Sequence, residues 1–411
     1  MIQIQNNEIC SGCTACASIC PQNCIQMKAD IQGFLYPEVH KEHCTDCHLC
    51  EKVCPLLNQN ALDTKQENTM NRTRAYAAFA NTEMKREDSA SGAIFPVLAR
   101  QIIEDGGIVY GVAYVEENGS LLVRHKKAET YEEVKSFLNA KYVQSNMQSV
   151  FSEIEGQLKA KRVVLFTGTP CQVSGLKSYL SNKRINTDTL FCIDNICHGV
   201  PSPKAWKSYV EYCMKIDGKK ELPSMNMRDK TTGWSHYMAS VLRTYKDGTT
   251  VREKASNNSY MRAFMSGLSL RPSCNACAYK GYERVSDITL GDFWGIWKYH
   301  KECDDNQGTS AVLIHSEKGM KLWEKIKEQN MLVCSLEVPV EEISEMNRNL
   351  LVTADMHPHR DAFLTEVTGE NFEQLVNQYQ PEAKLPLYRK CLDTIYTIKL
   401  KHYFRKNRKK D

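Results

Sequence analysis

The sequence predicts an α+β protein in which a cysteine-rich, ferredoxin-like module at residues 1–57 precedes a mixed α/β core at residues 73–330. Two observations lead to this prediction. Nine of the eighteen cysteines fall between Cys10 and Cys54, and strand-like and helix-like segments alternate in the stretch that follows. Because a chain of 411 residues exceeds the usual size of one domain, more than one folded unit is expected.

The charge is unevenly distributed along a chain of ordinary globular composition, 42% hydrophobic and 25% charged. Seven basic residues and one aspartate lie in 399–411, whereas residues 1–57 carry three lysines and six acidic residues, which suits docking to a basic redox partner protein. The first residues lack the features of a signal peptide, and no apolar run is long enough to span a membrane. With cysteines in closely spaced motifs rather than a disulfide scaffold, this favours the cytoplasm.

Two polar stretches suggest the remaining boundaries. Residues 58–72 are almost without large apolar side chains and are predicted to be a linker. Residues 331–411 are predicted to be a C-terminal helical extension with a basic tail. The tail at 395–410 interleaves apolar and basic residues, which is compatible with a peripheral membrane contact, although a solvated chain end is the favoured interpretation. No motif accompanies it that would indicate nucleic-acid binding.

Periodicity predicts the elements of the core in chain order. Apolar residues at helical spacing indicate a helix at 94–103, closed by two glycines. A β-branched and aromatic run at 108–115 indicates a strand. The same criteria predict helices at 132–138 and 150–158, strands at 162–166 and 190–196, and a hairpin of 240–245 with 250–253.

The N-terminal module contains one motif twice, three cysteines at C-x-x-C spacing followed by a fourth in a Cys-Pro pair. Thiolates are the usual ligands of 4Fe–4S clusters, and in two-cluster ferredoxins the fourth cysteine of each run binds the other cluster. Zinc sites use paired C-x-x-C motifs instead. The motif therefore predicts two 4Fe–4S clusters, the first held by Cys10, Cys13, Cys16 and Cys54, and the second by Cys44, Cys47, Cys50 and Cys20.

A second set of cysteines lies in the core. Cys171 and Cys197 each follow a predicted strand, and Cys274 and Cys277 form a C-x-x-C pair. Their spacing alone leaves three interpretations open: a third 4Fe–4S cluster, a zinc site, or coincidence. The other cysteines have no ligand spacing and are expected to be packed thiols: Cys24, Cys192, Cys213, Cys303, Cys334 and Cys391.

Several strings, in the same order, resemble the coenzyme F420 hydrogenase/dehydrogenase beta-subunit family. They lie between about residues 72 and 315, and a ferredoxin module is a frequent fusion partner in that family. The strings are SASGAIF (89–95), GGIVYGVAY (106–114), KYVQS (141–145), LFTGTPCQVSGLK (165–177), CHGVPSP (197–203), MRDKTTGW (227–234), RPSCNACAYKG (271–281) and SDITLGDFWGI (286–296).

The resemblance implies a flavoprotein core with bound FAD and a nearby 4Fe–4S cluster held by Cys171, Cys197, Cys274 and Cys277. Neither a G-x-G-x-x-G nor a P-loop motif is present, so FAD must be held by other groups. Ser89 and Ser91 could equally be helix N-caps. The residues expected to contact FAD are Ser89, Ser91, Gly92, Lys141, Tyr142, Ser145, Thr167, Gly168, Thr169 and Asp292. No catalytic residue is assigned.

Together these features predict a flavin- and iron–sulfur-dependent oxidoreductase. Electrons would pass between a ferredoxin-like carrier or a hydrogenase/dehydrogenase subunit, the clusters, FAD and a small-molecule substrate, in polysaccharide or other reductive metabolism. Two alternatives stay open at this point: an F420-oxidising or F420-reducing subunit of a larger complex, and a non-catalytic electron relay.

Overall fold

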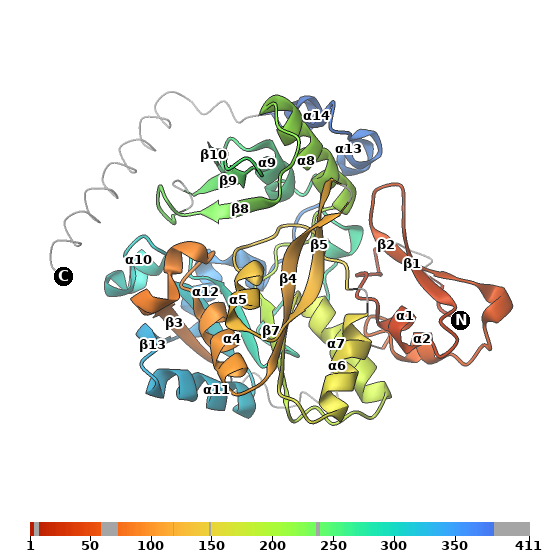
Figure 1. Cartoon of the computed structure of the whole chain (residues 1–411), viewed down its shortest axis with the longest axis horizontal. Coiled ribbons are helices and arrows are strands. Elements are labelled where there is room, and N and C mark those ends of the chain that lie inside the picture. The colour runs from red at the N-terminus through yellow and green to blue at the C-terminus, as the bar shows by residue number, and fades with distance from the viewer. Residues whose placement is uncertain (4–7, 59–72, 118, 148, 236–238, 382–411) are drawn as a thin grey trace.

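The computed structural model describes residues 1–3, 8–58, 73–117, 119–147, 149–235 and 239–381 (Figure 1). The basic tail, Cys391 and nearly all of the expected linker lie outside the described residues. The expected order is confirmed, since a small cysteine-rich N-terminal module precedes a mixed α/β core. Among the described helices, none combines the length and the apolar character that crossing a membrane requires.

An eight-stranded mixed sheet forms the centre of the core, in the order β13-β3-β12-β11-β7-β6-β4-β5. Strands β4, β6, β7 and β11 run parallel to their neighbours within that group, and the other neighbouring pairs are antiparallel. The strands are β3 (Arg74–Ala80), β4 (Ile108–Glu117), β5 (Ser120–Ala128), β6 (Val164–Thr167), β7 (Leu190–Asn195), β11 (Ile288–Asp292), β12 (Ser310–Ile314) and β13 (Leu332–Val338).

Alternate residues of these strands enter different hydrophobic clusters, because successive side chains of a strand point to opposite faces. In β4, Ile108 and Tyr110 pack on the face covered by α6 (Val150–Lys159) and α7 (Pro170–Asn182). Val109 packs on the opposite face. That face is covered by α4 (Ile94–Glu104), α5 (Tyr131–Val134) and α11 (Glu317–Glu328).

A smaller antiparallel sheet, β10-β9-β8, lies beside the central sheet in Figure 1. Its core is aromatic and includes Trp206, Tyr209 and Tyr260. The elements of this region are β8 (Ser224–Asp229), β9 (Ser240–Thr244), β10 (Thr250–Lys254), α8 (Pro203–Ile216), α9 (Ser259–Met265), α13 (Arg360–Glu366) and α14 (Phe372–Tyr379). The remaining helices of the core are α10 (Ile296–Tyr299), α12 (Val340–Met346) and the short 3-10 turns η2 (Thr82–Met84), η3 (Arg86–Asp88), η4 (Lys135–Phe137), η5 (Pro272–Cys274), η6 (Lys301–Cys303) and η7 (Arg348–Leu350).

The N-terminal module contains α1 (Ala15–Ile19), α2 (Leu49–Lys52) and a hairpin of β1 (Ile25–Ala29) with β2 (Leu35–Val39), followed by η1 (Lys41–His43). The module is packed against the core (Figure 1). Phe34, at the tip of the hairpin, is fully buried among the side chains of the aromatic core. On the other side, Ser178 of α7 donates a hydrogen bond to the carbonyl of Val53 at 2.7 Å.

The predicted strands and helices of the core agree with the structure to within a few residues, whereas the C-terminal extension agrees only in part. Residues 331–411 were expected to be helical, and α12, α13 and α14 lie there, but β13 at Leu332–Val338 pairs antiparallel with β3. Strand β13 lies at one edge of the central sheet and has a mixed pattern, with Val333 and Glu337 exposed and Val338 buried. The boundary at residue 330 therefore falls just before a strand of that sheet.

Candidate functional site

The thiols expected to hold the first cluster lie close to one another. Burial, together with charge on Cys10 and Cys54, raises the pKa of Cys13 to about 12. Burial likewise raises the pKa of Cys16, and charge on Cys13, Cys10 and Cys54 again adds to the effect. Cys54 of the second motif thus lies beside the triplet of the first motif.

The thiols expected to hold the second cluster line one small pocket, which contains Cys20, Cys44, Cys47 and Cys50. Cys24, expected to be a packed thiol, is buried and lines the same pocket, with its sulfur 3.4 Å from that of Cys20. The two motifs also share an unusual backbone. Thr14 and His48, at equivalent places in the two motifs, both adopt the left-handed conformation just before a short helix.

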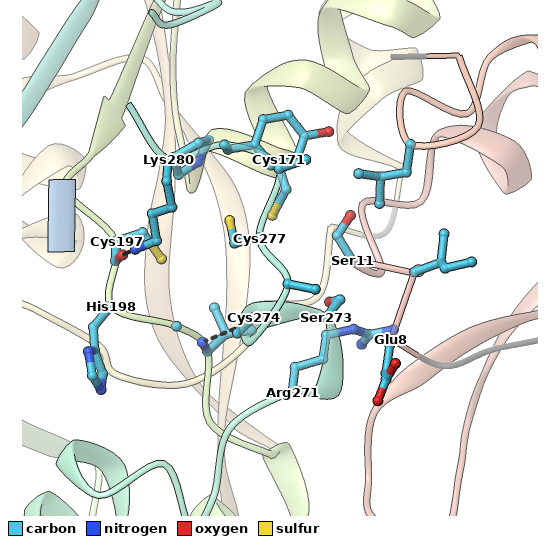
Figure 2. Close-up of a pocket in the computed structure, with 18 of the residues that line it drawn as sticks. Glu8, Ser11, Cys171, Cys197, His198, Arg271, Ser273, Cys274, Cys277 and Lys280 are labelled. Atoms are coloured by element: carbon cyan, nitrogen blue, oxygen red, sulfur yellow. Dashed lines mark hydrogen bonds between the residues drawn. The ribbon is translucent and has the colours of Figure 1, made fainter. Parts of the chain in front are cut away.

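The four cysteines of the core line one cavity of about 410 Å³, between the central sheet and the N-terminal module. Cys171 lies in the first turn of α7, and Cys197 follows the end of β7. Cys274 closes η5, and its sulfur accepts a hydrogen bond from the amide of Val200 at 3.4 Å. Figure 2 shows the four side chains around a common space, with Glu8 and Ser11 of the module on the opposite side.

The chemistry of this cavity fits a 4Fe–4S cluster. Burial raises the pKa of Cys171 to about 12 and raises those of Cys197 and Cys274, so thiolates here need a neighbouring cation. Binding of iron supplies that charge and displaces the thiol protons. Among the described residues, no three His, Cys, Asp or Glu side chains converge on a point suited to a single metal ion. A cubane does not need such convergence, because each thiolate binds its own iron.

Three cations line the same cavity: Arg271, Lys280 and Arg284. Lys280 donates hydrogen bonds to the carbonyls of Cys197 and Asn349 at 2.6 and 2.7 Å, and burial lowers its pKa. Arg284 is buried and donates to the carbonyl of Tyr279 at 2.6 Å. These charges favour an anionic group in the cavity.

Arg271 joins the cavity to the N-terminal module. Its side chain is fully buried and donates to the carbonyls of Cys10 and Leu35, at 2.7 and 3.0 Å, and to Gln144 at 2.8 Å. Gly12 makes this approach possible: its φ is +70°, and an added Cβ would lie 2.8 Å from a nitrogen of Arg271. At the same interface, an added Cβ on Gly175 of α7 would lie 2.9 Å from the sulfur of Cys13.

A larger cavity of about 780 Å³ lies at the carboxyl ends of β6, β7 and β11, the edge where α/β proteins commonly bind ligands. Its size is in the range of small-molecule and cofactor sites. Nine of the ten residues expected to contact FAD line it: Ser89, Ser91, Lys141, Tyr142, Ser145, Thr167, Gly168, Thr169 and Asp292.

Gly92 is the exception. Its amide already donates to the hydroxyl of Ser310 at 3.0 Å, and an added Cβ would lie 2.4 Å from the carbonyl oxygen of Ala78. Gly92 is therefore packed against the backbone and does not line the cavity, contrary to the expected contact with FAD. Ser89 and Ser91 are not helix N-caps either, since Ala93 holds that position in α4. The hydroxyl of Ser89 is buried and has no hydrogen-bond partner within the described part of the chain.

A buried network supports the floor of the large cavity. The Nε2 of His125 lies 3.0 Å from the carbonyl of Thr167, which can only accept, so the Nδ1 accepts from the hydroxyl of Ser145 at 3.0 Å. Ser145 in turn accepts from Gln172 at 3.0 Å. Burial lowers the pKa of His125 to about 4, consistent with a neutral ring. Sequence reasoning missed His125, which lies in none of the family strings, and did not single out Gln172, although the string LFTGTPCQVSGLK contains it.

Two buried cations, Lys141 and Arg228, line the large cavity. The ammonium group of Lys141 donates to the carbonyl of Leu138 at 2.6 Å, and burial lowers its pKa to about 7. Arg228 has a side chain only 8% exposed and lies 3.4 Å from a carboxylate oxygen of Asp292. Within the described residues, its Nε and Nη2 have no hydrogen-bond partner. Sequence reasoning did not single out Arg228, although the string MRDKTTGW contains it.

The two cavities share a wall, the segment from Cys197 to Val200. Cys197 lies beside the other three thiols, whereas the ring of His198 turns away from them in Figure 2. His198 packs edge-on against Phe264, which stacks on Tyr142 in the large cavity. One short loop after β7 therefore separates the thiols from the larger space.

Comparison with known proteins agrees with the division of the chain into an N-terminal module and a core. Residues 161–338 match the family described as the C terminus of the beta subunit of coenzyme F420 hydrogenase/dehydrogenase, and residues 9–57 match the 4Fe-4S dicluster domain. These matches confirm the resemblance found in the sequence. The second match supports two 4Fe–4S clusters in the N-terminal module.

Two individual proteins are also similar. An uncharacterized protein of Methanocaldococcus jannaschii is 23% identical over 207 residues, which cover 44% of this chain. The match covers 55% of that protein, so the chain spans about half the length of this curated relative. A chain of the F420-reducing NiFe hydrogenase complex from Methanosarcina barkeri has 16% identity and a TM-score of 0.43, covering 74% of this chain and 91% of that one.

Proposed function

This chain joins a 4Fe–4S dicluster domain to the C-terminal domain of the coenzyme F420 hydrogenase/dehydrogenase beta subunits, and from that premise we propose that it is an iron–sulfur flavoprotein oxidoreductase. It would pass electrons between an external carrier, three 4Fe–4S clusters, FAD and a small-molecule substrate. The domains proposed to carry out this electron transfer are the module at 1–57, the core at 73–330 and the C-terminal part at 331–411.

The proposed ligands of the clusters are the three groups of thiols. Cys10, Cys13, Cys16 and Cys54 would hold the first cluster, and Cys20, Cys44, Cys47 and Cys50 the second. Cys171, Cys197, Cys274 and Cys277 would hold the third. Support for the third comes from four partly buried thiols around one cavity, flanked by cations that would offset the negative charge of a thiolate-bound cluster.

The proposed flavin site is the large cavity. When bound, a flavin exchanges either a hydride or single electrons, so it can join a two-electron substrate to one-electron clusters. Side chains that line the cavity would hold the flavin. Lys141 and the hydroxyl of Ser89, which has no hydrogen-bond partner within the described residues, would donate hydrogen bonds to phosphate oxygens. Tyr142 would pack against an aromatic ring. Arg228, with two nitrogens that make no hydrogen bond within the described residues, would take a further anionic group of the flavin or of the substrate.

The single observation that carries the proposal is the wall shared by the two cavities. Cys197 lines the cavity of the four thiols and also the large cavity, and the module's Ser11 reaches the first of these. Groups bound in the module, in the thiol cavity and in the large cavity would therefore follow one another. Such an order suits electron transfer in either direction.

Cofactor analysis of the anaerobically purified full chain tests this proposal. Three cubane clusters predict about twelve iron and twelve acid-labile sulfide per chain, and denaturation should release FAD. Eight iron without flavin would instead support the non-catalytic relay. Zinc without labile sulfide would contradict every cluster in the proposal.

One alternative concerns the electron carrier. The family match keeps an F420-oxidising or F420-reducing subunit of a larger complex as a second candidate. Reduction of the oxidised protein by reduced F420, NADH and reduced ferredoxin, compared side by side, separates the candidates. Rapid bleaching with reduced F420 alone would favour the subunit. Reduction by ferredoxin alone would favour the oxidoreductase, and a role in polysaccharide or other reductive metabolism would then depend on the substrate.

A further inference from the structure

Two cysteines outside the proposed cluster sites lie against each other. The sulfurs of Cys303 and Cys334 are 3.0 Å apart, although 31 residues separate them in the chain. Cys303 ends η6, just before the loop that leads to β12, and Cys334 lies in the edge strand β13. Because they share no ligand spacing, the sequence predicts that both are packed thiols. We propose that they form a redox-active dithiol that closes to an intramolecular disulfide by exchange with low-molecular-weight disulfides.

The surroundings give the two thiols different roles. Cys303 is 4% exposed, whereas Cys334 is partly exposed beside Val333, which is 65% exposed on the sheet edge. We therefore expect a small disulfide to react first with Cys334, the more exposed of the two thiols. The hydrogen bond from the Cys303 thiol lowers the pKa of Cys334, and it raises that of Cys303. Cys334 is thus the attacking thiolate, and Cys303 is the resolving thiol.

The exchange conserves atoms and electrons. The Cys334 thiolate attacks one sulfur of the small disulfide, forms a mixed disulfide and releases the other half as a thiolate. The Cys303 thiol then loses its proton and attacks the sulfur of Cys334, which releases the second half. Two protein thiols are oxidised by two electrons, and one small disulfide is reduced to two thiols. Thiol-to-disulfide closure requires the sulfurs to approach by about 1 Å.

A disulfide here would tie the wall of the large cavity to the sheet edge. The loop at 304–309 follows Cys303 directly, and in it Asp305 accepts two hydrogen bonds from Arg86, at 2.6 and 2.9 Å. The carbonyl of Gln307 accepts from Lys230 at 2.7 Å, and the same ammonium group reaches the carbonyl of Ser91. Ser91 lines the large cavity. Closing a disulfide between Cys303 and Cys334 would therefore restrain the loop that is linked to Ser91 through Lys230.

Peptide mapping of the full chain tests the pair directly. Anaerobically purified protein is incubated with glutathione disulfide, alkylated, and digested with trypsin. The fragments 302–318 and 328–348 each contain one cysteine. We expect them to be recovered joined, with the mass of two hydrogens lost, and separate again after reduction. Recovery of both as alkylated free thiols would overturn the proposal.

Variants check the two roles. In Cys303→Ser, a mixed disulfide with glutathione should persist on Cys334, since nothing resolves it. In Cys334→Ser, Cys303 should remain alkylatable only after unfolding.

Cys213→Ser is the matched control, because Cys213 is a buried thiol on α8 near Tyr209, and its loss should leave the joined peptides unchanged. Joined peptides in either of the first two variants, or glutathione on Cys303 in Cys334→Ser, would contradict the assignment. If Cys303→Ser does not fold, Cys303→Ala replaces it, and the map of the natural chain is decisive by itself.

Discussion

At the scale of the residue, Arg271 connects the N-terminal module to the core. Its side chain is completely buried and donates hydrogen bonds to two carbonyls of the module, those of Cys10 and Leu35. Its guanidinium also packs over the ring of Tyr36 at 4.4 Å. One side chain of the core thus holds the first cysteine motif and the hairpin together.

Replacing Arg271 by Gln should loosen this docking. Loss of two charged hydrogen bonds costs about 3 kcal/mol locally, on the order of a hundredfold in an opening equilibrium. Hydrogen exchange of the amides at 8–13 and 35–39 should accelerate accordingly. Arg100→Gln is a suitable control, because Arg100 is a more exposed residue paired with Glu104 on its own helix. Unchanged exchange in the Arg271 variant would show that other contacts hold the module.

Lys141 should make FAD binding dependent on pH. Burial lowers its pKa to about 7, so the ammonium charge is present below that pH and is lost as the pH rises through it. If Lys141 binds a phosphate, the affinity of flavin-depleted protein for FAD should fall by about tenfold between pH 6 and pH 8. Fluorescence titration measures this, with the exposed Lys135 replaced by Gln as the control. The same fall in Lys141→Gln would rule out Lys141 as its source.

Residues in repeated spacing could be predicted from the sequence, and isolated ones could not. The eight module cysteines stand in two copies of one motif, and the structure brings them into two groups. His125, Gln172 and Arg228 act through neighbours that only the folded chain supplies. The closeness of Cys303 to Cys334 likewise depends on how β13 pairs, which no spacing reveals.

At the scale of the element, the hairpin β1–β2 anchors the module through its tip. Asp30 accepts hydrogen bonds from the amides of Gln32 and Phe34 at 3.0 and 2.9 Å, which shapes the turn. The turn carries Phe34 into the core, where Arg360 packs over its ring. A short polar turn therefore places a large apolar side chain where the two parts meet.

Truncation of Phe34 should release the hairpin. Phe34→Ala removes a completely buried ring and should cost about 3–5 kcal/mol. Limited proteolysis within 25–39 should become faster in this variant. Ile31→Ala is the matched control, since Ile31 lies in the same turn and is 72% exposed. Equal proteolysis of both variants would show that the tip contributes little.

Strands and helices of the core were predictable where their period was clear, as in β4 and α4. The strand β13 was missed because it is an edge strand with a mixed pattern of burial. Such a strand is stabilised by pairing with β3 more than by its own pattern. The order of strands across the sheet also depends on contacts between distant segments, which one sequence does not display.

At the scale of the whole molecule, three groups of thiols and one large cavity form a sequence of neighbouring sites. The module provides two groups, and the third lies where the module meets the core. The loop Cys197–Val200 then separates the third group from the large cavity. This order is the physical reason to propose electron transfer through the interface between the two parts.

Iron and acid-labile sulfide in Cys274→Ser, compared with the natural chain, test this account most directly. Cys274 lies in the cavity of the core and in neither motif of the module. The account predicts about twelve iron and twelve sulfide in the natural chain and about eight of each in the variant, because one cubane is lost and two remain. Equal iron and sulfide in the two proteins would contradict a third cluster at this site.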